Sequence, residues 1–228
     1  MDMAQQRVYG ADDAAGKNKA AKDVARGTLA EGIAGAAAVV LSILGLVGIF
    51  PLIMLYVATI AVGAALLFEG GAISARISSL VGQRMENRAE LSDIASAMTT
   101  EFVAGATGLA LGVLALLGIA PITLVSVASI VYGGALIMGG SVTARINALS
   151  LNESYESETA RSVAKEAVSA ASGVQILIGI AAVVLGIMAL LNIMAVTLVL
   201  VAMLALGFAD MLSGGAIGAR VLAVFRKH

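Results

Sequence analysis

Two acidic residues lie inside long apolar stretches of the sequence. Glu69 directly precedes a Gly-Gly pair near the end of one stretch, and Asp210 follows Ala195 by 15 residues in another. In a helix this separation is about 22 Å, which leaves Asp210 within a hydrocarbon layer roughly 30 Å thick. Ionisable residues at this depth predict a functional site, such as a path for a proton or a solute. A protonated or hydrogen-bonded structural acid fits the sequence equally well.

A second set of charged residues marks the ends of the apolar stretches. Three arginines occupy matching positions, and so do two glutamates, with Gln175 in the third glutamate position. Helical side chains lean toward the N-terminus of their own helix, so these Arg and Glu side chains are expected to approach the inner headgroup boundary from opposite sides. We interpret them as interfacial ion pairs or lipid contacts, with an anion-binding arginine ring as the alternative. The set is Arg76, Arg145, Arg220, Glu31 and Glu101.

No catalytic constellation is visible in the sequence. There is no cysteine, and the single histidine, His228, is the last residue. A thiol nucleophile, a disulfide and a cysteine-based metal site are therefore excluded. Tyr56 and Tyr132 are expected to be packing residues. The sequence predicts neither a metal nor a cofactor, and it predicts a protein that is not an enzyme.

The composition is that of a membrane protein. Hydrophobic residues make up 60% of the 228 residues, charged residues 13%, and the mean hydropathy is +0.99. Soluble domains are about half apolar and a quarter charged. The net charge of −1 gives no indication of a nucleic-acid partner. The polar N-terminal segment lacks the apolar core of a signal peptide, so it is expected to stay in the cytoplasm.

The elements that must position these residues come in three copies. A seven-residue Gly-Gly…Arg signature closes each copy, which predicts an internal repeat. Two apolar stretches precede each signature and are joined by a short turn at Gly48, Gly118 or Asn192, residue types that tolerate a left-handed helix end. Pro51 and Pro121 then suit the first position of the next helix. Each copy therefore predicts a transmembrane helical hairpin, which gives an all-α protein with six membrane-spanning helices.

The distribution of positive charge orients the hairpins. All 14 Lys and Arg residues lie in the terminal segments, in the long connectors or at the helix ends beside them. Positive residues remain on the cytoplasmic side, so both termini and both connectors are predicted there and the repeats are parallel. The first helix of each hairpin is expected to extend two or three turns into the cytoplasm. The predicted segments are the N-terminal segment 1–30, hairpin 31–76, connector 77–100, hairpin 101–145, connector 146–173, hairpin 174–220 and tail 221–228.

The hairpins share a pattern in which a Leu-Gly turn precedes a proline and glycines follow in the next apolar stretch. The residues that carry it are Ile43–Pro51 and Leu116–Pro121, with Gly63, Gly70, Gly133 and Gly139 downstream. The third repeat lacks the proline, and the whole chain lacks tryptophan. This three-hairpin pattern resembles a known family of short-repeat membrane proteins, the HdeD type. The resemblance implies six spans in three repeats and an inner-membrane protein linked to acid stress, and it supplies no site residues.

The number and spacing of the glycines indicate close packing of helices. The chain has 26 glycines, and pairs such as Gly108 and Gly112 are four residues apart. Small residues at helical spacing let helices pack closely in lipid, and they exceed what three hairpins need, which predicts a homo-oligomer. We expect a non-enzymatic, self-associating structural or scaffolding protein of the cytoplasmic membrane. The alternative is a channel or carrier for a small solute or proton that uses Asp210 and Glu69. The expected partners are the lipid bilayer, further copies and other membrane proteins, with no nucleic acid.

Overall fold

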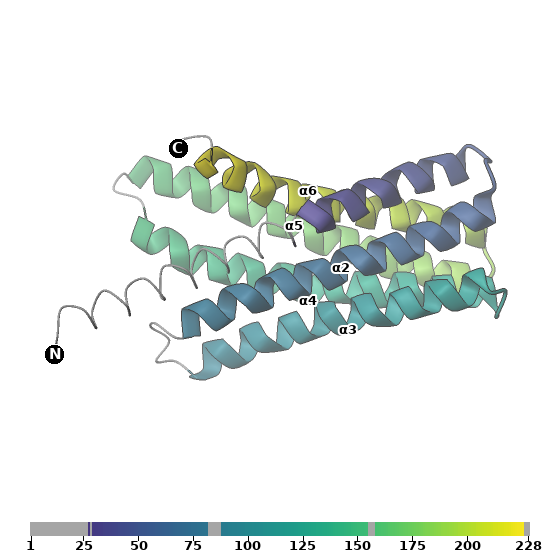
Figure 1. Ribbon diagram of the computed structural model, residues 1–228, viewed down its shortest axis with the longest axis horizontal. Helices are drawn as coiled ribbons and strands as arrows, with labels where there is room; N and C mark the ends of the chain where they lie inside the picture. The colour runs from purple at the N-terminus through teal and green to yellow at the C-terminus, as the bar shows by residue number, and fades with distance from the viewer. Residues whose placement is uncertain (1–26, 28, 82–87, 155–157, 226–228) are drawn as a thin grey trace, which may run out of the picture.

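The computed structural model describes residues 27, 29–81, 88–154 and 158–225, with side chains in 27, 29–70, 100–139 and 173–213. The described residues form six helices and no strand, which confirms the all-α prediction. An N-terminal helix covers residues 29–46. It is followed by α2 (Pro51–Val81), α3 (Arg88–Leu116), α4 (Pro121–Ser154), α5 (Glu158–Leu190) and α6 (Ala195–Phe225) (Figure 1).

Five helices contain an apolar stretch that is long enough to cross a membrane, as expected of a membrane protein. The apolar part of α3, Thr100–Leu116, is shorter. Its 17 residues span about 26 Å, less than a hydrocarbon layer of roughly 30 Å. The described structure therefore has five helices of membrane length and one shorter apolar helix, and the six-span arrangement stays a prediction. The five long stretches are Leu29–Leu46, Pro51–Gly70, Pro121–Gly139, Gly173–Leu190 and Ala195–Ser213.

The same turn follows the N-terminal helix, α3 and α5. In the first turn, the Gly48 N–H donates to the Gly45 carbonyl (3.1 Å) and the Ile49 N–H donates to the Leu44 carbonyl (3.0 Å). This pair of bonds is a Schellman motif, which requires a left-handed residue at its centre. Gly48 and Gly118 have φ of 95° and 85°. Asn192 takes the same position with φ of 64°, which confirms the predicted left-handed residues.

The three turns lie at one end of the bundle, and the extended helices reach toward the other (Figure 1). α3 begins at Arg88 and α5 at Glu158, well before their apolar stretches. This confirms the predicted extensions for these two helices. α2, α4 and α6 also continue beyond their apolar stretches, which was not expected from the sequence. Any extension of the N-terminal helix before residue 27 lies outside the described residues.

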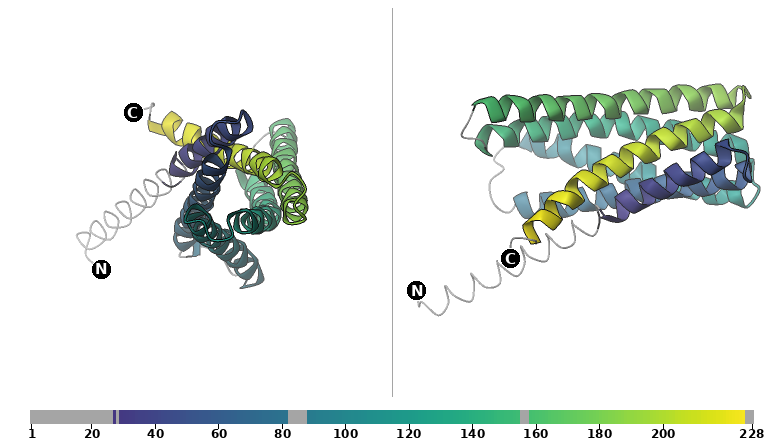
Figure 2. Two further views of the ribbon diagram at one scale, coloured as in Figure 1. Left: turned by 90° about the vertical axis from the view of Figure 1, so that its right-hand side faces the viewer. Right: turned by 90° about the horizontal axis from the view of Figure 1, so that it is seen from above.

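The second helix of each pair lies at the centre of the bundle. α2, α4 and α6 all contact one another, α3 packs against α2 and α4, and α5 packs against α4 and α6. The N-terminal helix packs against α6 through Gly35, which lies beside Gly207 and Met211. Seen end-on, the helices surround a common axis (Figure 2). Three inner helices are thus surrounded by three outer ones.

Glycine pairs set the distance between inner and outer helices. A Cβ atom at Gly133 would lie 2.5 Å from the Gly179 carbonyl oxygen, so neither residue tolerates a side chain without movement. Each pair joins the inner helix of one repeat to the outer helix of the next, and the last pair joins α6 back to the N-terminal helix. These contacts support close helix packing as the role of the glycines. The pairs are Gly63–Gly105, Gly133–Gly179 and Gly207–Gly35.

Candidate functional site: a buried carboxyl cluster

Four carboxyl groups are buried at one level of the bundle. Glu31 is 1% exposed, Glu69 8%, Glu101 4% and Asp210 1%. Each of the four lies within electrostatic range of others in the set, and Glu69 interacts with all three of the rest. The two predicted intramembrane acids are therefore brought together with two residues that were expected at the interface.

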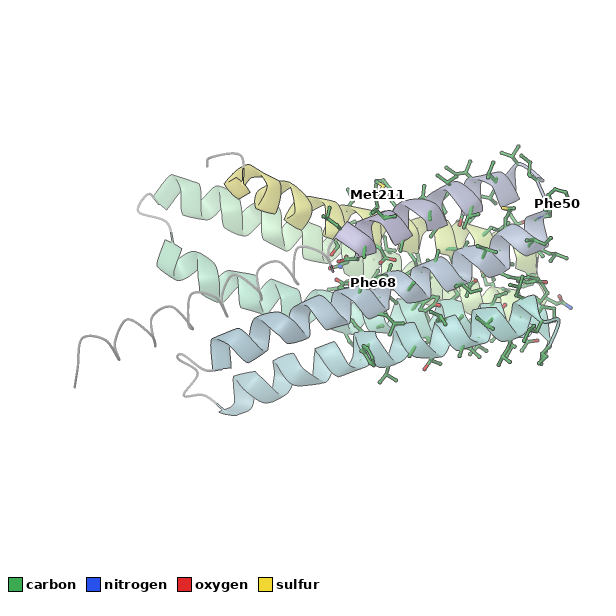
Figure 3. The ribbon with its side chains drawn as sticks, in the orientation of Figure 1. Phe50, Phe68 and Met211 are labelled. Atoms are coloured by element: carbon green, nitrogen blue, oxygen red, sulfur yellow. The ribbon has the colours of Figure 1, made fainter. Side chains whose placement is uncertain are left out.

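The four acids come from four different helices at similar depth. Glu31 lies on the N-terminal helix, Glu69 on α2, Glu101 on α3 and Asp210 on α6. Each is 15 to 18 residues from the hairpin turn at one end of its helix, which corresponds to about 22–27 Å. The labelled Phe68 and Met211, neighbours of Glu69 and Asp210, lie far from Phe50 at the turn end (Figure 3). The cluster is therefore near one boundary of the apolar layer.

The repeat register explains why the acids meet. The equivalent turn residues Gly48, Gly118 and Asn192 and the glycine pairs align the three copies. In this alignment Glu31 and Glu101 correspond to Gln175, and Glu69 corresponds to Gly139 and Ser213. Both sets occupy the same level, one on the outer helices and one on the inner helices. Glu31, Glu69 and Glu101 therefore belong to one six-position layer, whose remaining members are Gly139, Gln175 and Ser213. Asp210 lies three residues before Ser213, about one helical turn from this layer.

The alignment also identifies the residues equivalent to Asp210. They are Leu66 in the first repeat and Leu136 in the second. In this alignment the Gly-Gly signature of the second repeat begins one position early. Arg145 is therefore displaced from the positions of Arg76 and Arg220 by one residue, or about 100° around its helix.

Two small residues accommodate the carboxyl groups. Glu101 Oε1 occupies the space that a side chain at Gly139 would need, so the absence of a side chain on α4 lets Glu101 enter the cluster. Ser213 Oγ donates a long hydrogen bond of 3.4 Å to Glu69 Oε1, and the same serine lies beside Glu31. Glu101 therefore lies against a glycine of α4, and Glu31 and Glu69 share a serine of α6.

The cluster contains oxygen atoms without a partner. Glu31 Oε1, Glu101 Oε2 and Asp210 Oδ2 are buried and accept no hydrogen bond. No Lys, Arg or His occurs in the segments whose side chains are described. Within these same segments, no three acidic residues are placed to hold a metal ion together. Four adjacent acids thus lie out of water without a described counter-charge.

The predicted contacts of the arginines lie outside the described side chains. Arg76, Arg145 and Arg220 are on the extended parts of α2, α4 and α6. Their pairing with Glu31 or Glu101, or with lipid, stays a prediction. The membership of Glu31 and Glu101 in the same site as Glu69 was missed. The sequence did contain a signal for this. Glu31 and Glu101 lie about as far from their hairpin turns as Glu69 does from its own turn.

Tyr132 adds a polar group between the cluster and the turns. Its hydroxyl donates to the Thr59 carbonyl of α2 at 2.8 Å, so it links two inner helices as well as packing between them. Tyr132 is fully buried and lies within electrostatic range of Asp210. The ring occupies space left free by Gly108 on α3. This tyrosine is therefore the nearest described hydroxyl to the carboxyl cluster on the α4 side.

The axis between the cluster and the turns is otherwise mainly apolar. Thr59 and Ser126 satisfy their hydroxyl groups on carbonyls of their own helices, and Ser129 bonds to α5 through the Ala182 carbonyl. In the described arrangement these hydroxyl groups bond to backbone and not to one another. The fully or nearly fully buried apolar side chains here are Leu55, Val62, Leu66, Val125, Leu136, Val199, Leu200, Met203 and Leu206.

Comparison with protein-family models, with curated proteins and with solved structures finds no match for this chain. The resemblance of two hairpins to HdeD-type proteins therefore stays a hypothesis. The site has to be interpreted from its own residues.

Proposed function

We propose that this chain is a non-enzymatic integral membrane protein that carries a small positively charged solute, bound at the buried carboxyl cluster. The observation that supports it is the meeting of Glu31, Glu69, Glu101 and Asp210 with no described counter-charge. An ionised carboxylate in the apolar layer costs free energy, up to about 2.5–3.5 kcal/mol at the centre of a membrane helix. Adjacent carboxylates also repel one another, which adds to this cost. A bound positive charge offsets this cost.

A carrier fits the geometry better than an open channel. The cluster lies near one boundary of the apolar layer, and buried side chains such as Leu66 and Leu206 fill the axis beyond it. In the described arrangement the cluster is separated from the turn end by this packed core. A solute bound at the cluster would cross only if helices moved, as in alternating access.

The proposed topology is six spans in three parallel hairpins in the cytoplasmic membrane, with both termini and both connectors in the cytoplasm. The positive-inside distribution of Lys and Arg supports it. So do the three matching turns at one end of the bundle (Figure 1). On this topology the carboxyl cluster lies on the cytoplasmic side of the bilayer.

Flux through liposomes tests the proposal. Purified protein should move a cation or protons across the membrane, and Asp210→Asn and Asp210→Leu should abolish the movement. The leucine variant reproduces Leu66 and Leu136, so the fold should tolerate it. Thr197→Val is the control, because Thr197 is on the same helix, exposed and distant from the cluster. Flux that persists in Asp210→Asn would remove this residue from the mechanism, and no flux in the wild type would reject a carrier.

Self-association as a scaffold was the main expectation from the sequence, and the glycine contacts within the chain weaken its support. Of the helical glycines whose surroundings are described, only Gly134 and Gly173 face open space, and the others lie close to residues of the same chain. Few of these glycines remain for contacts between copies. We keep the homo-oligomer as a prediction that native mass spectrometry in mild detergent tests. A multimer would support it, and a monomer at all concentrations would show that the glycines serve only internal packing.

A further inference from the structure

The surroundings of the carboxyl cluster indicate which positively charged species it binds. This inference rests on the proposed function. The acids face one another from four elements: Glu31 from the N-terminal helix, Glu69 from α2, Glu101 from α3 and Asp210 from α6. α4 presents Gly139 at this level and Tyr132 about two turns nearer the hairpin turns, and α5 has the uncharged Gln175. Every described titratable group that faces the cluster is therefore a carboxyl or a phenol.

The helices around the cluster are in backbone contact. A Cβ atom at Gly35 would lie 2.9 Å from Asp210 Cβ and 2.6 Å from the Met211 nitrogen. A Cβ atom at Gly105 would lie 3.1 Å from Leu66 Cβ, one turn below Glu69. The N-terminal helix and α3 therefore approach α6 and α2 as closely as helices can at this level.

Such packing disfavours a metal ion. Calcium takes about six to eight oxygen ligands, and magnesium demands octahedral geometry with several waters. No three of the described acids are placed to share an ion. At Gly139 the Glu101 carboxyl already fills the space beside the backbone of α4. A proton needs no space of its own beside these carboxyl groups.

We infer that protons occupy the carboxyl cluster and are the solute it binds. A protonated carboxyl donates one O–H, whereas a carboxylate only accepts. Protonation would let the unpartnered oxygens of Glu31, Glu101 and Asp210 form carboxyl–carboxylate hydrogen bonds, which are short and strong. Each proton adds to one carboxylate oxygen when it binds, and its release restores the carboxylate. Like-charge repulsion is thereby replaced by attraction.

Infrared spectroscopy of the full chain in nanodiscs tests the inference. At pH 7 the acids exposed to water are ionised, so a protonated carboxyl C=O band that wild type and variants do not share comes from buried acids. The ester C=O band of the lipids is common to all samples. We expect such a band in the wild type, shifted in D₂O, and reduced in Glu31→Gln and in Asp210→Leu. Gln175 and Leu136 already occupy the equivalent positions, so both replacements suit this bundle. A spectrum with carboxylate bands alone at pH 7 would overturn the inference.

Thermal unfolding provides a second measurement. If the folded protein holds more protons than the unfolded chain, its stability falls as the pH rises. The wild-type melting temperature should therefore drop between about pH 6 and about pH 9, where the acids of the unfolded chain are already ionised. The variant with Glu31→Gln, Glu69→Gln, Glu101→Gln and Asp210→Asn should show a smaller drop, since amides cannot titrate. An equal drop in both proteins would contradict protons in the cluster.

The two proposals fail separately. A protonated carboxyl band without any flux in liposomes would leave the proton site standing and reject the carrier. Flux of sodium or potassium ions together with fully ionised carboxylates would support the carrier and reject the proton site. Proton flux that Asp210→Asn abolishes, together with the band, would support both.

Discussion

Gly35 of the N-terminal helix and Gly207 of α6 touch backbone to backbone. A Cβ atom on Gly35 would lie 2.7 Å from the Gly207 carbonyl oxygen, and one on Gly207 would lie 2.9 Å from the Gly35 carbonyl oxygen. This contact joins the first described helix to the last and closes the ring of hairpins. It also brings Glu31 and Asp210 to the same site, because both lie within one turn of this contact. Closure of the ring and assembly of the carboxyl cluster are therefore the same event.

The closing contact should be sensitive to a single methyl group. In Gly207→Ala the new Cβ would lie 2.8 Å from Ala38 Cβ, so the helices must separate. Overpacking of this kind costs about 1–3 kcal/mol. We expect a lower melting temperature by circular dichroism in detergent. Gly134→Ala is the matched control, since nothing lies within 4 Å of a Cβ there. Equal melting temperatures for Gly207→Ala and wild type would show that the contact is looser than described.

Tyr132 and Gly108 should be energetically coupled. The Gly108→Ala methyl group would occupy the space of the Tyr132 ring, and we expect it to destabilise by about 1–3 kcal/mol. Tyr132→Leu alone removes the hydrogen bond to Thr59, worth about 0.5–1.5 kcal/mol, and leaves a cavity. The double variant reproduces Ala182 and Leu206 of the third repeat. Its cost should be smaller than the sum of the two single costs by about 0.5–3 kcal/mol in a double-mutant cycle. Additive costs would contradict the shared space.

Gly139 should act as a positioning residue for Glu101. A methyl group at position 139 would take the place of Glu101 Oε1 and push the carboxyl out of the cluster. Gly139→Ala should therefore weaken the protonated carboxyl band and reduce flux in liposomes. Gly134→Ala, on the same helix, should leave both unchanged. If Gly139→Ala kept the wild-type band, Glu101 would not depend on this glycine for its place.

The proposed topology can be checked by chemical labelling, because the chain has no native cysteine. Single cysteines at Ile49, Ile119 and Ile193 should react with an impermeant thiol reagent from outside intact cells. Cysteines at Asn87 and Ser157 should stay unlabelled until the membrane is opened. Labelling of either connector position from outside would reject the orientation and, with it, the parallel hairpins.

The sequence by itself determined the class of the molecule and its local structure. Apolar stretches of membrane length can satisfy their backbone in lipid only as helices, so the all-α prediction depended on composition alone. The turns at Gly48, Gly118 and Asn192 were also readable, because a left-handed residue at a helix end favours glycine or asparagine. The depth of Asp210 followed from counting residues along one helix.

Only the tertiary structure decided which helix faces which. Glu31 and Asp210 are 179 positions apart in the chain, and they meet because Gly35 and Gly207 allow the first and last helices to touch. A helix presents a face every 3.6 residues, but periodicity along one helix does not identify its neighbour in the bundle. The partner of each small-residue face, within the chain or in another copy, depends on packing in three dimensions. For this reason the sequence revealed two isolated acids, and the fold made them part of a four-carboxyl site.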